Sequence, residues 1–204
     1  MKEFERAIQL NPNYATAHQW FGNQTLILSG DFDRAIAEGK RAVELDPLSL
    51  IINAGLGIDY FAARRYDEAI EQLLKTIEID PRFYYAHWIL GEALEMKGQL
   101  PEALKEYKKA AELDNDTAML GFIAEVSAKM GRRDEALKIL AQLQQLASQR
   151  YVSDYTFALV HLALGENEEA IAWLERAYEH RAGPDIMFIK LDPMLRSLAR
   201  PSAI

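Results

Sequence analysis

The chain has 204 residues, and its 23 Lys and Arg against 31 Asp and Glu give a formal net charge of −8. This acidic balance disfavours a nucleic-acid-binding protein, because phosphate recognition needs clustered basic side chains. The sequence has no cysteine, which excludes disulfide frameworks, Cys-ligated metal sites and thiol nucleophiles. Half of the residues are hydrophobic, so the chain can bury a core. The longest apolar stretch, Leu50 to Ala63, is too short and too polar to insert into a membrane.

The sequence repeats itself with a period close to 34 residues. An alanine followed by an aliphatic residue recurs at intervals of 34, 34, 33 and 34 residues, at Ala35, Ala69, Ala103, Ala136 and Ala170. A small residue precedes each alanine by 12 or 13 residues, at Gly22, Gly57, Gly91, Ala124 and Ala158. Small residues on two such ladders indicate pairs of helices that pack closely, since a bulky side chain would separate the backbones. The first repeat is one residue longer than the others, and we place that residue in the turn between its two helices.

In chain order, the apolar spacing predicts a half repeat, five helical hairpins and a terminal segment. Their predicted ranges are 1–12 for the half repeat, 15–49, 50–83, 84–116, 117–150 and 151–183 for the hairpins, and 184–204 for a C-terminal cap. Asp46-Pro47 and Asp80-Pro81 are expected to follow the ends of second helices, because the residue before proline avoids the helical region. Left-handed caps are expected at the ends of first helices, at Gly30, Gly98, Gly131 and Gly165, with Arg64 in the second repeat.

The chain resembles the tetratricopeptide repeat family. The resemblance rests on Phe21-Gly22, Leu56-Gly57 and Leu90-Gly91 in first helices, and on the segment Tyr66 to Ile70 that opens a second helix. It implies an all-α, right-handed superhelical solenoid of about five helical hairpins, with an N-terminal half repeat and a C-terminal capping segment. The departures from the family pattern are His18, Asn53 and His87 in place of a tryptophan, and Gly39 in place of an aromatic residue.

The segment from Tyr151 to Ser197 is similar to the C-terminal repeat arrays of bacterial signalling proteins. In such proteins the array follows a winged-helix regulator, a protein kinase or a nucleotide cyclase domain. The resemblance therefore implies that the chain is a fragment or short variant of a larger regulatory protein. An ordinary cytoplasmic location is expected, or a periplasmic one if the array follows a missing membrane segment.

No arrangement of residues in the sequence predicts an enzyme. There is no glycine-rich phosphate loop, no nucleophile elbow and no pair of histidines at the spacing of metal ligands. His18, His87 and His161 lie within predicted helices and are expected to pack between them, and His180 lies in a charged run at a helix end. We therefore expect no catalytic, cofactor-binding or metal-binding residues.

The family directs four places of each first helix into a concave groove, and these places define the candidate binding residues. They are apolar and aromatic with an acidic middle. The candidates are Asn23, Ile51, Ile58, Phe61, Tyr85, Trp88, Glu92, Glu95, Glu125 and Tyr155. Only Asn23 matches the Lys, Asn and Arg set with which family members hold a terminal carboxylate. The expected partner is instead a protein or peptide with apolar anchors and Lys or Arg, held mainly by Tyr85 and Trp88.

Two alternatives remain open at this stage. In the first, the groove is not open, because its apolar residues pack on neighbouring repeats or are covered by the C-terminal segment. These residues are Ile51, Ile58, Phe61 and Leu159. In the second, the array is an architectural module. Phe4 and Ile8 of the half repeat have no first helix to cover them and would pair with a second copy.

Overall fold

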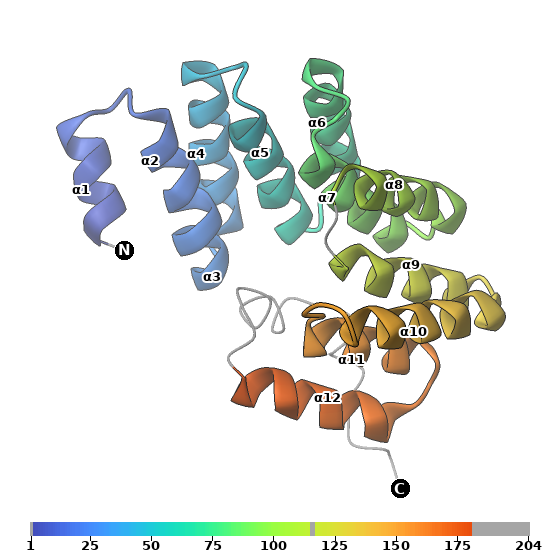
Figure 1. Ribbon diagram of the computed structural model, residues 1–204. Coiled ribbons are helices and arrows are strands. Elements are labelled where there is room, and N and C mark those ends of the chain that lie inside the picture. Colours follow the sequence, from blue (N-terminus) through green and yellow to red (C-terminus); the bar gives the residue numbers. More distant parts are fainter. Residues whose placement is uncertain (1, 115–116, 181–204) are drawn as a thin grey trace, which may run out of the picture. The chain divides into compact units, whose positions relative to one another are not determined.

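A computed structural model describes residues 2–114 and 117–180, and the helices of each of these two ranges form a compact unit (Figure 1). No strand occurs within these described ranges. The predicted fold class, an all-α solenoid of paired helices, is confirmed. The predicted C-terminal cap, 184–204, lies outside the described residues.

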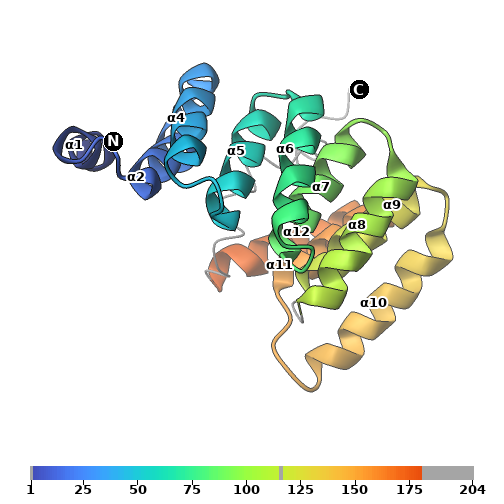
Figure 2. The same ribbon diagram turned by 90° about the horizontal axis from the view of Figure 1, so that it is seen from above.

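The first unit is an array of helices that follow one another from α1 to α8 (Figures 1 and 2). Its elements are α1 (Lys2–Leu10), α2 (Ala15–Trp20), the π-helix η1 (Phe21–Leu26), α3 (Ile27–Ser29), α4 (Phe32–Leu45), α5 (Leu50–Ala62), α6 (Tyr66–Ile79), α7 (Tyr84–Met96) and α8 (Leu100–Leu113). The second unit contains α9 (Ala118–Lys129), α10 (Arg133–Ala147), α11 (Asp154–Ala163) and α12 (Asn167–Glu179). Consecutive helices of a hairpin pack on each other, and first helices pack on the first helices of neighbouring repeats within each unit.

The ladder of small residues marks the close contacts inside the hairpins. A Cβ atom added at Gly57 would lie 2.8 Å from Leu73, and one added at Gly91 would lie 2.6 Å from the ring of Tyr107. These distances leave no room for a side chain. The predicted reason for the glycines, a close approach of two helices, is therefore confirmed.

The predicted helix ends are also confirmed. Helix α4 ends at Leu45 and α6 at Ile79, each directly before an Asp-Pro pair. The four glycines expected at the ends of first helices have φ between +74° and +82°. Arg64 takes the same left-handed conformation with φ 59°, although a side chain disfavours it.

The extra residue of the first repeat lies in a helix, so its predicted position in the turn is wrong. Gly30 follows Gly22 by eight residues, whereas Gly98 follows Gly91 by seven. The turn itself is unchanged, since Ala35 follows Gly30 by five residues, as Ala103 follows Gly98. The additional residue is taken up by η1, because a π-helix holds more residues in each turn than an α-helix.

Helix α1 of the half repeat packs on the first hairpin. Phe4 and Ile8 contact a buried cluster that includes Phe21 and Leu26 of η1 and Ala35 of α4. The two apolar residues that were expected to lack cover are thus partly buried by the chain's own next repeat. Less of their surface is therefore left for contact with a second copy.

Candidate functional site

The candidate binding residues of the first unit come from three consecutive first helices. Helix α5 packs against α2 and η1 on one side and against α7 on the other. We call the surface that carries the candidates of this unit the first-helix face. It consists of Asn23, Ile51, Ile58, Phe61, Tyr85, Trp88, Glu92 and Glu95.

Asn23 uses its side-chain amide inside the unit. Its Nδ2 donates to the carbonyl oxygen of Gly55 at 3.0 Å and to Oδ1 of Asp59 at 2.8 Å. Gln19, one turn earlier, donates to the carbonyl of Ile51 at 3.0 Å. The two amides lie against the backbone of α5, where a Cβ atom on Gly55 would come within 2.8 Å of Asn23 Oδ1. Asn23 therefore joins two repeats.

Asp59 is a buried carboxyl group that the sequence did not single out. Its side chain is 1% exposed, and within the described ranges its Oδ2 has no hydrogen-bond partner. The carboxyl lies close to Gly22 and Gly39, and a Cβ atom on Gly39 would overlap Oδ2. Burial raises the pKa of Asp59 to about 8, against the opposing effect of the hydrogen bond from Asn23. At neutral pH this carboxyl is mostly protonated.

The aromatic residues at the start of α7 form a contact chain on the first-helix face. The rings of Tyr85 and Trp88 meet edge to face, with centroids 5.5 Å apart and an interplanar angle of 76°. Phe83 and Tyr84 each place a ring 6.2 Å from that of Tyr85. Both Tyr85 and Trp88 are half-buried. Burial raises the pKa of Tyr85 to about 12, and the negative charge of Glu92 adds to the increase.

Part of the predicted apolar surface belongs to the core. Ile58 packs on the cluster around Phe21 of the preceding repeat, and Phe61 packs on a cluster that includes Ala93 of the next repeat. Ile51 is 46% exposed. The alternative that these residues pack on neighbouring repeats thus describes Ile58 and Phe61 better than Ile51.

Two predicted residues belong to the second unit and form no part of the first-helix face as defined above. Glu125 is 6% exposed, and Nζ of Lys129 lies 2.6 Å from its carboxylate. Tyr155 is 8% exposed and packs on Leu159 and Ala177.

Like Glu125, Glu95 of the first unit has a partner in the chain, since it accepts a hydrogen bond of 2.8 Å from the hydroxyl of Tyr107. These acidic groups already interact with the chain itself.

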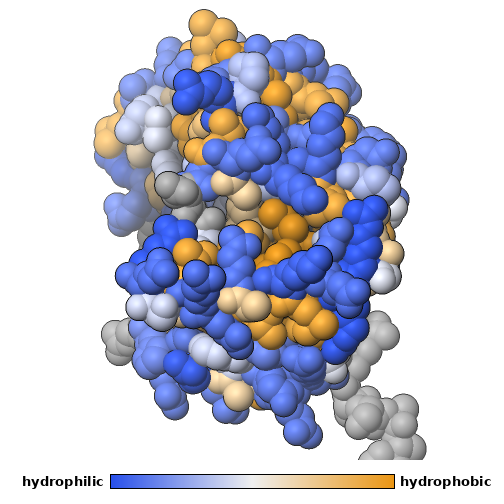
Figure 3. Space-filling model, turned by 45° about the vertical axis from the view of Figure 1, so that its right-hand side comes forward, coloured by the Kyte–Doolittle hydropathy of each residue, from blue (hydrophilic) through white to orange (hydrophobic). Residues whose placement is uncertain are grey.

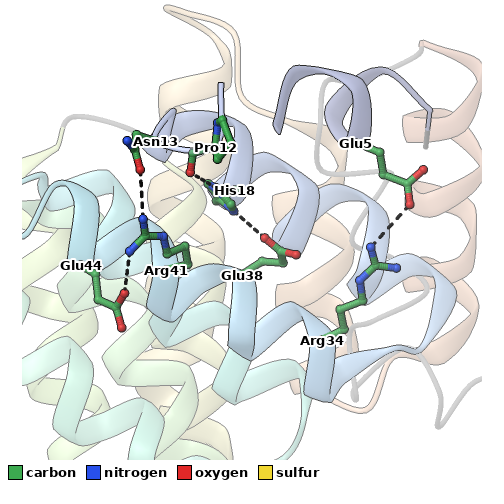
Figure 4. Close-up of polar contacts among 8 residues, drawn as sticks. All are labelled: Glu5, Pro12, Asn13, His18, Arg34, Glu38, Arg41 and Glu44. Atoms are coloured by element: carbon green, nitrogen blue, oxygen red, sulfur yellow. Dashed lines mark hydrogen bonds and ion pairs between the residues drawn. The ribbon is translucent and has the colours of Figure 1, made fainter. Parts of the chain in front are cut away.

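The residues that replace the family's tryptophan close the turn before each repeat. His18 has Nε2 3.0 Å from the carbonyl of Pro12 and Nδ1 2.5 Å from Glu38 (Figure 4). His87 repeats this arrangement, with 3.1 Å to the carbonyl of Pro81 and 2.6 Å to Glu106. The hydrogen bond with Glu106 raises the pKa of His87, against the opposing effect of burial.

Asn53 fills the same place in the second repeat without a charge. Its Nδ2 donates to the carbonyl of Pro47 at 2.9 Å, and its Oδ1 accepts from Gln72 at 2.9 Å. Three residue pairs therefore serve one purpose, which is to fasten a first helix both to the preceding turn and to its second helix. Within residues 2–114 and 117–180, no three His, Asp or Glu side chains gather as a set that could hold a metal ion.

The surface is a mixture of polar and apolar regions, and Figure 3 shows clusters of apolar side chains enclosed by polar ones. Across the described part of the chain, no helix combines the length and the apolar character needed to cross a membrane.

Comparison with known proteins agrees with this architecture. Two tetratricopeptide repeat family models match, one over residues 54–118 and one over residues 155–180. The BBSome complex member BBS4 of Bos taurus is 28% identical over 84% of this chain, but the match spans only 33% of the length of that curated relative.

Two solved structures show the same fold at 27% identity. One is TTC0263 of Thermus thermophilus, a thermophilic tetratricopeptide repeat protein, with a TM-score of 0.63 over 72% of this chain and 80% of that chain. The other is YrrB, described as a tetratricopeptide repeat protein with an unusual peptide-binding site, with a TM-score of 0.56 over 97% of both chains.

Proposed function

Since the chain is a tetratricopeptide repeat protein, we propose that it is a non-catalytic interaction module whose first-helix face binds a segment of a partner protein. The observation that carries the proposal is the half-buried pair Tyr85 and Trp88 on α7, beside Glu92 and Glu95. Aromatic side chains of this kind dominate binding at protein surfaces. The similarity to YrrB, which is described as having a peptide-binding site, supports the same function.

The chemistry of this face defines the partner. Tyr85, Trp88 and the exposed Ile51 offer apolar contacts. Glu92 and Glu95 add negative charge on the same helix, and Glu95 keeps this charge while it accepts the hydrogen bond from Tyr107. The partner segment then carries aliphatic or aromatic anchors with Lys or Arg beside them, because opposite charges steer and orient an encounter. A terminal carboxylate is a poor ligand here, since the amide of Asn23 already binds Gly55 and Asp59.

The test is affinity capture from the source lysate with the wild-type chain and a variant carrying Tyr85→Ala and Trp88→Ala. Proteins that bind through the first-helix face are lost with the variant. The matched control is Tyr178→Ala, which removes an aromatic side chain that is 74% exposed in the second unit. Trp88→Ala should also leave the thermal midpoint nearly unchanged from wild type. Equal capture by wild type and double variant would show that the aromatic pair does not carry the binding, and a large loss of stability would show that the pair is core.

A narrower proposal concerns the larger protein. The resemblance of Tyr151 to Ser197 to arrays in bacterial signalling proteins supports a regulatory role beside a kinase, cyclase or DNA-binding domain. The relatives named above do not add to that support, because they are described as repeat proteins and a BBSome member. Reading the coding sequence upstream of Met1 tests this role directly.

The architectural alternative, a homodimer through the N-terminal end, keeps one supporting observation. Leu10, Trp20 and Leu28 are 70%, 39% and 60% exposed. Light scattering at tens of micromolar chain distinguishes a monomer from a dimer. A dimer that Leu28→Glu dissociates would support this alternative. A monomeric mass at that concentration would remove it.

A further inference from the structure

The second unit contains a hollow that lies apart from the residues assigned above. It has a volume of about 440 Å³ and opens between the end of α10, the turn before α11, the start of α11 and the end of α12. Side chains of Arg150, Asp154, Phe157, Trp173, Arg176 and His180 line it. The volume is in the range of small-ligand and side-chain pockets.

The hollow is positively charged in an acidic chain. Asp154 is the acidic side chain of the lining, and it is 7% exposed. It lies 3.6 Å from Nη2 of Arg176 and 2.7 Å from Nδ1 of His180. Among the lining residues, Arg150 and Arg176 against Asp154 leave one positive charge even when His180 is neutral, while the whole chain carries −8. This local excess favours an anionic ligand.

The guanidinium of Arg176 is held in place. Its central carbon lies 4.2 Å from the centroid of the Trp173 ring, and that ring stacks on Phe157 at 4.4 Å with an interplanar angle of 17°. The side chain is still 52% exposed. Because stacking and Asp154 fix the orientation of the planar group, less side-chain entropy is lost when its remaining N–H groups bind a carboxylate. The half-buried ring of Trp173, with the buried Phe157 stacked on it, adds an apolar surface beside it.

We propose that this hollow binds an acidic segment of a partner protein, in which an Asp or Glu carboxylate is adjacent to an aromatic or aliphatic side chain. Arg176 receives the carboxylate as a bidentate partner, and Arg150 provides further positive charge. The apolar side chain rests against the half-buried ring of Trp173. This site has the opposite charge preference to the first-helix face, and it does not depend on the function proposed for that face.

The test uses the full chain, labelled with ¹⁵N, and the peptide acetyl-Ala-Glu-Phe-Glu-Ala-amide. The control peptide, acetyl-Ala-Gln-Phe-Gln-Ala-amide, has the same shape without charge. The acidic peptide should shift the indole resonance of Trp173 and the amides around Arg150 and Arg176, and the neutral peptide should bind at least about tenfold more weakly. Equal binding of the two peptides, or shifts elsewhere in the chain only, would overturn the proposal.

Variants locate the interaction. Arg176→Gln should weaken the acidic peptide about tenfold, and Arg150→Gln, which lies outside the stack, should weaken it severalfold. The matched control is Arg41→Gln, which removes a surface guanidinium of the first unit and should change nothing. Unchanged affinity in both hollow variants refutes the assignment. Inorganic phosphate serves as a second probe, and if it saturates the hollow as tightly as the peptide does, the apolar part of the proposal is wrong.

Discussion

Replacing the buried carboxyl of Asp59 by an amide should stabilise the first unit at alkaline pH. Asp59→Asn keeps the size and shape of the side chain and keeps an oxygen for Asn23 to donate to. It removes the ionisation, which burial in the folded state opposes. The expected benefit therefore depends on pH in a way that an ordinary packing change does not.

The magnitude follows from the difference in pKa between the folded and unfolded states. The pKa of Asp59 is about 8 in the fold and 3.8 without its environment. Between these values the unfolded chain loses a proton that the folded chain keeps, so stability falls as pH rises from about 4 to about 8 and is then constant. Four pKa units at about 1.36 kcal/mol each amount to about 5 kcal/mol over this window.

The amide recovers only part of that free energy. A second N–H group then sits where Oδ2 has no hydrogen-bond partner within the described ranges, and a buried donor without an acceptor costs about 1–3 kcal/mol. We expect Asp59→Asn to be about 2–4 kcal/mol more stable than wild type at pH 8. At pH 4, where ionisation has little effect on stability, it should be about 1–3 kcal/mol less stable than wild type because of that unpaired N–H group.

The assay is urea unfolding followed by tryptophan fluorescence in a Trp173→Phe background. The signal then comes from Trp20 and Trp88, both in the first unit. Asp33→Asn is the control, because it removes a carboxylate from an exposed position. Parallel stability curves for wild type and Asp59→Asn from pH 4 to pH 8 would refute the reasoning, since they would mean that Asp59 is ionised in the fold.

The other predictions concern single positions of the repeats. The fold raises the pKa of His87, so its contribution to the free energy of unfolding is full below its unfolded pKa of about 6.5 and is lost as pH rises through the folded value. His87→Gln should abolish this part of the loss of stability at rising pH. An unchanged profile of stability against pH would contradict it. Gly91→Ala should cost about 1–3 kcal/mol in urea unfolding, because its Cβ would meet the Tyr107 ring at 2.6 Å, and a neutral effect would show that the ring moves freely. Arg64→Gly should raise stability by about 1 kcal/mol by relieving φ 59°, and thermal unfolding that shows no gain would argue against strain there.

The repeating features of the fold could be predicted because each depends on local rules. Gly91 and Gly57 indicate close helix contacts, and Gly30 or Gly98 indicate a left-handed cap, wherever the period places them. The first repeat departs from these rules in two ways, with one extra residue and with Gly39 in place of an aromatic side chain. Both departures are visible in the sequence. The buried carboxyl that lies beside Gly22 and Gly39 is not, because it belongs to Asp59 of the next repeat.

The candidate site was predictable only in part for a related reason. The place of a residue in the repeat predicts which helix face it occupies, and the rings of Tyr85 and Trp88 do meet on α7. It does not tell whether a neighbouring repeat covers that face. Ile58 is partly covered by the cluster around Phe21, and Asn23 is engaged by Gly55 and Asp59, through contacts between residues more than 30 positions apart. The spacing of residues within one repeat does not predict such contacts.

The hydrogen bonds of His18, Asn53 and His87 to the prolines six residues before them have a consequence for how the chain tolerates rearrangement. Each bond closes over a short stretch of chain, so a hairpin moved, duplicated or deleted together with its preceding turn would keep it. The junction of the first two repeats lacks this freedom, because Gly39 and Asn23 are matched to Asp59 across the boundary. Recombination that separates the first two repeats should therefore cost more stability than recombination that moves them together, because it leaves the buried carboxyl of Asp59 without its matched neighbours.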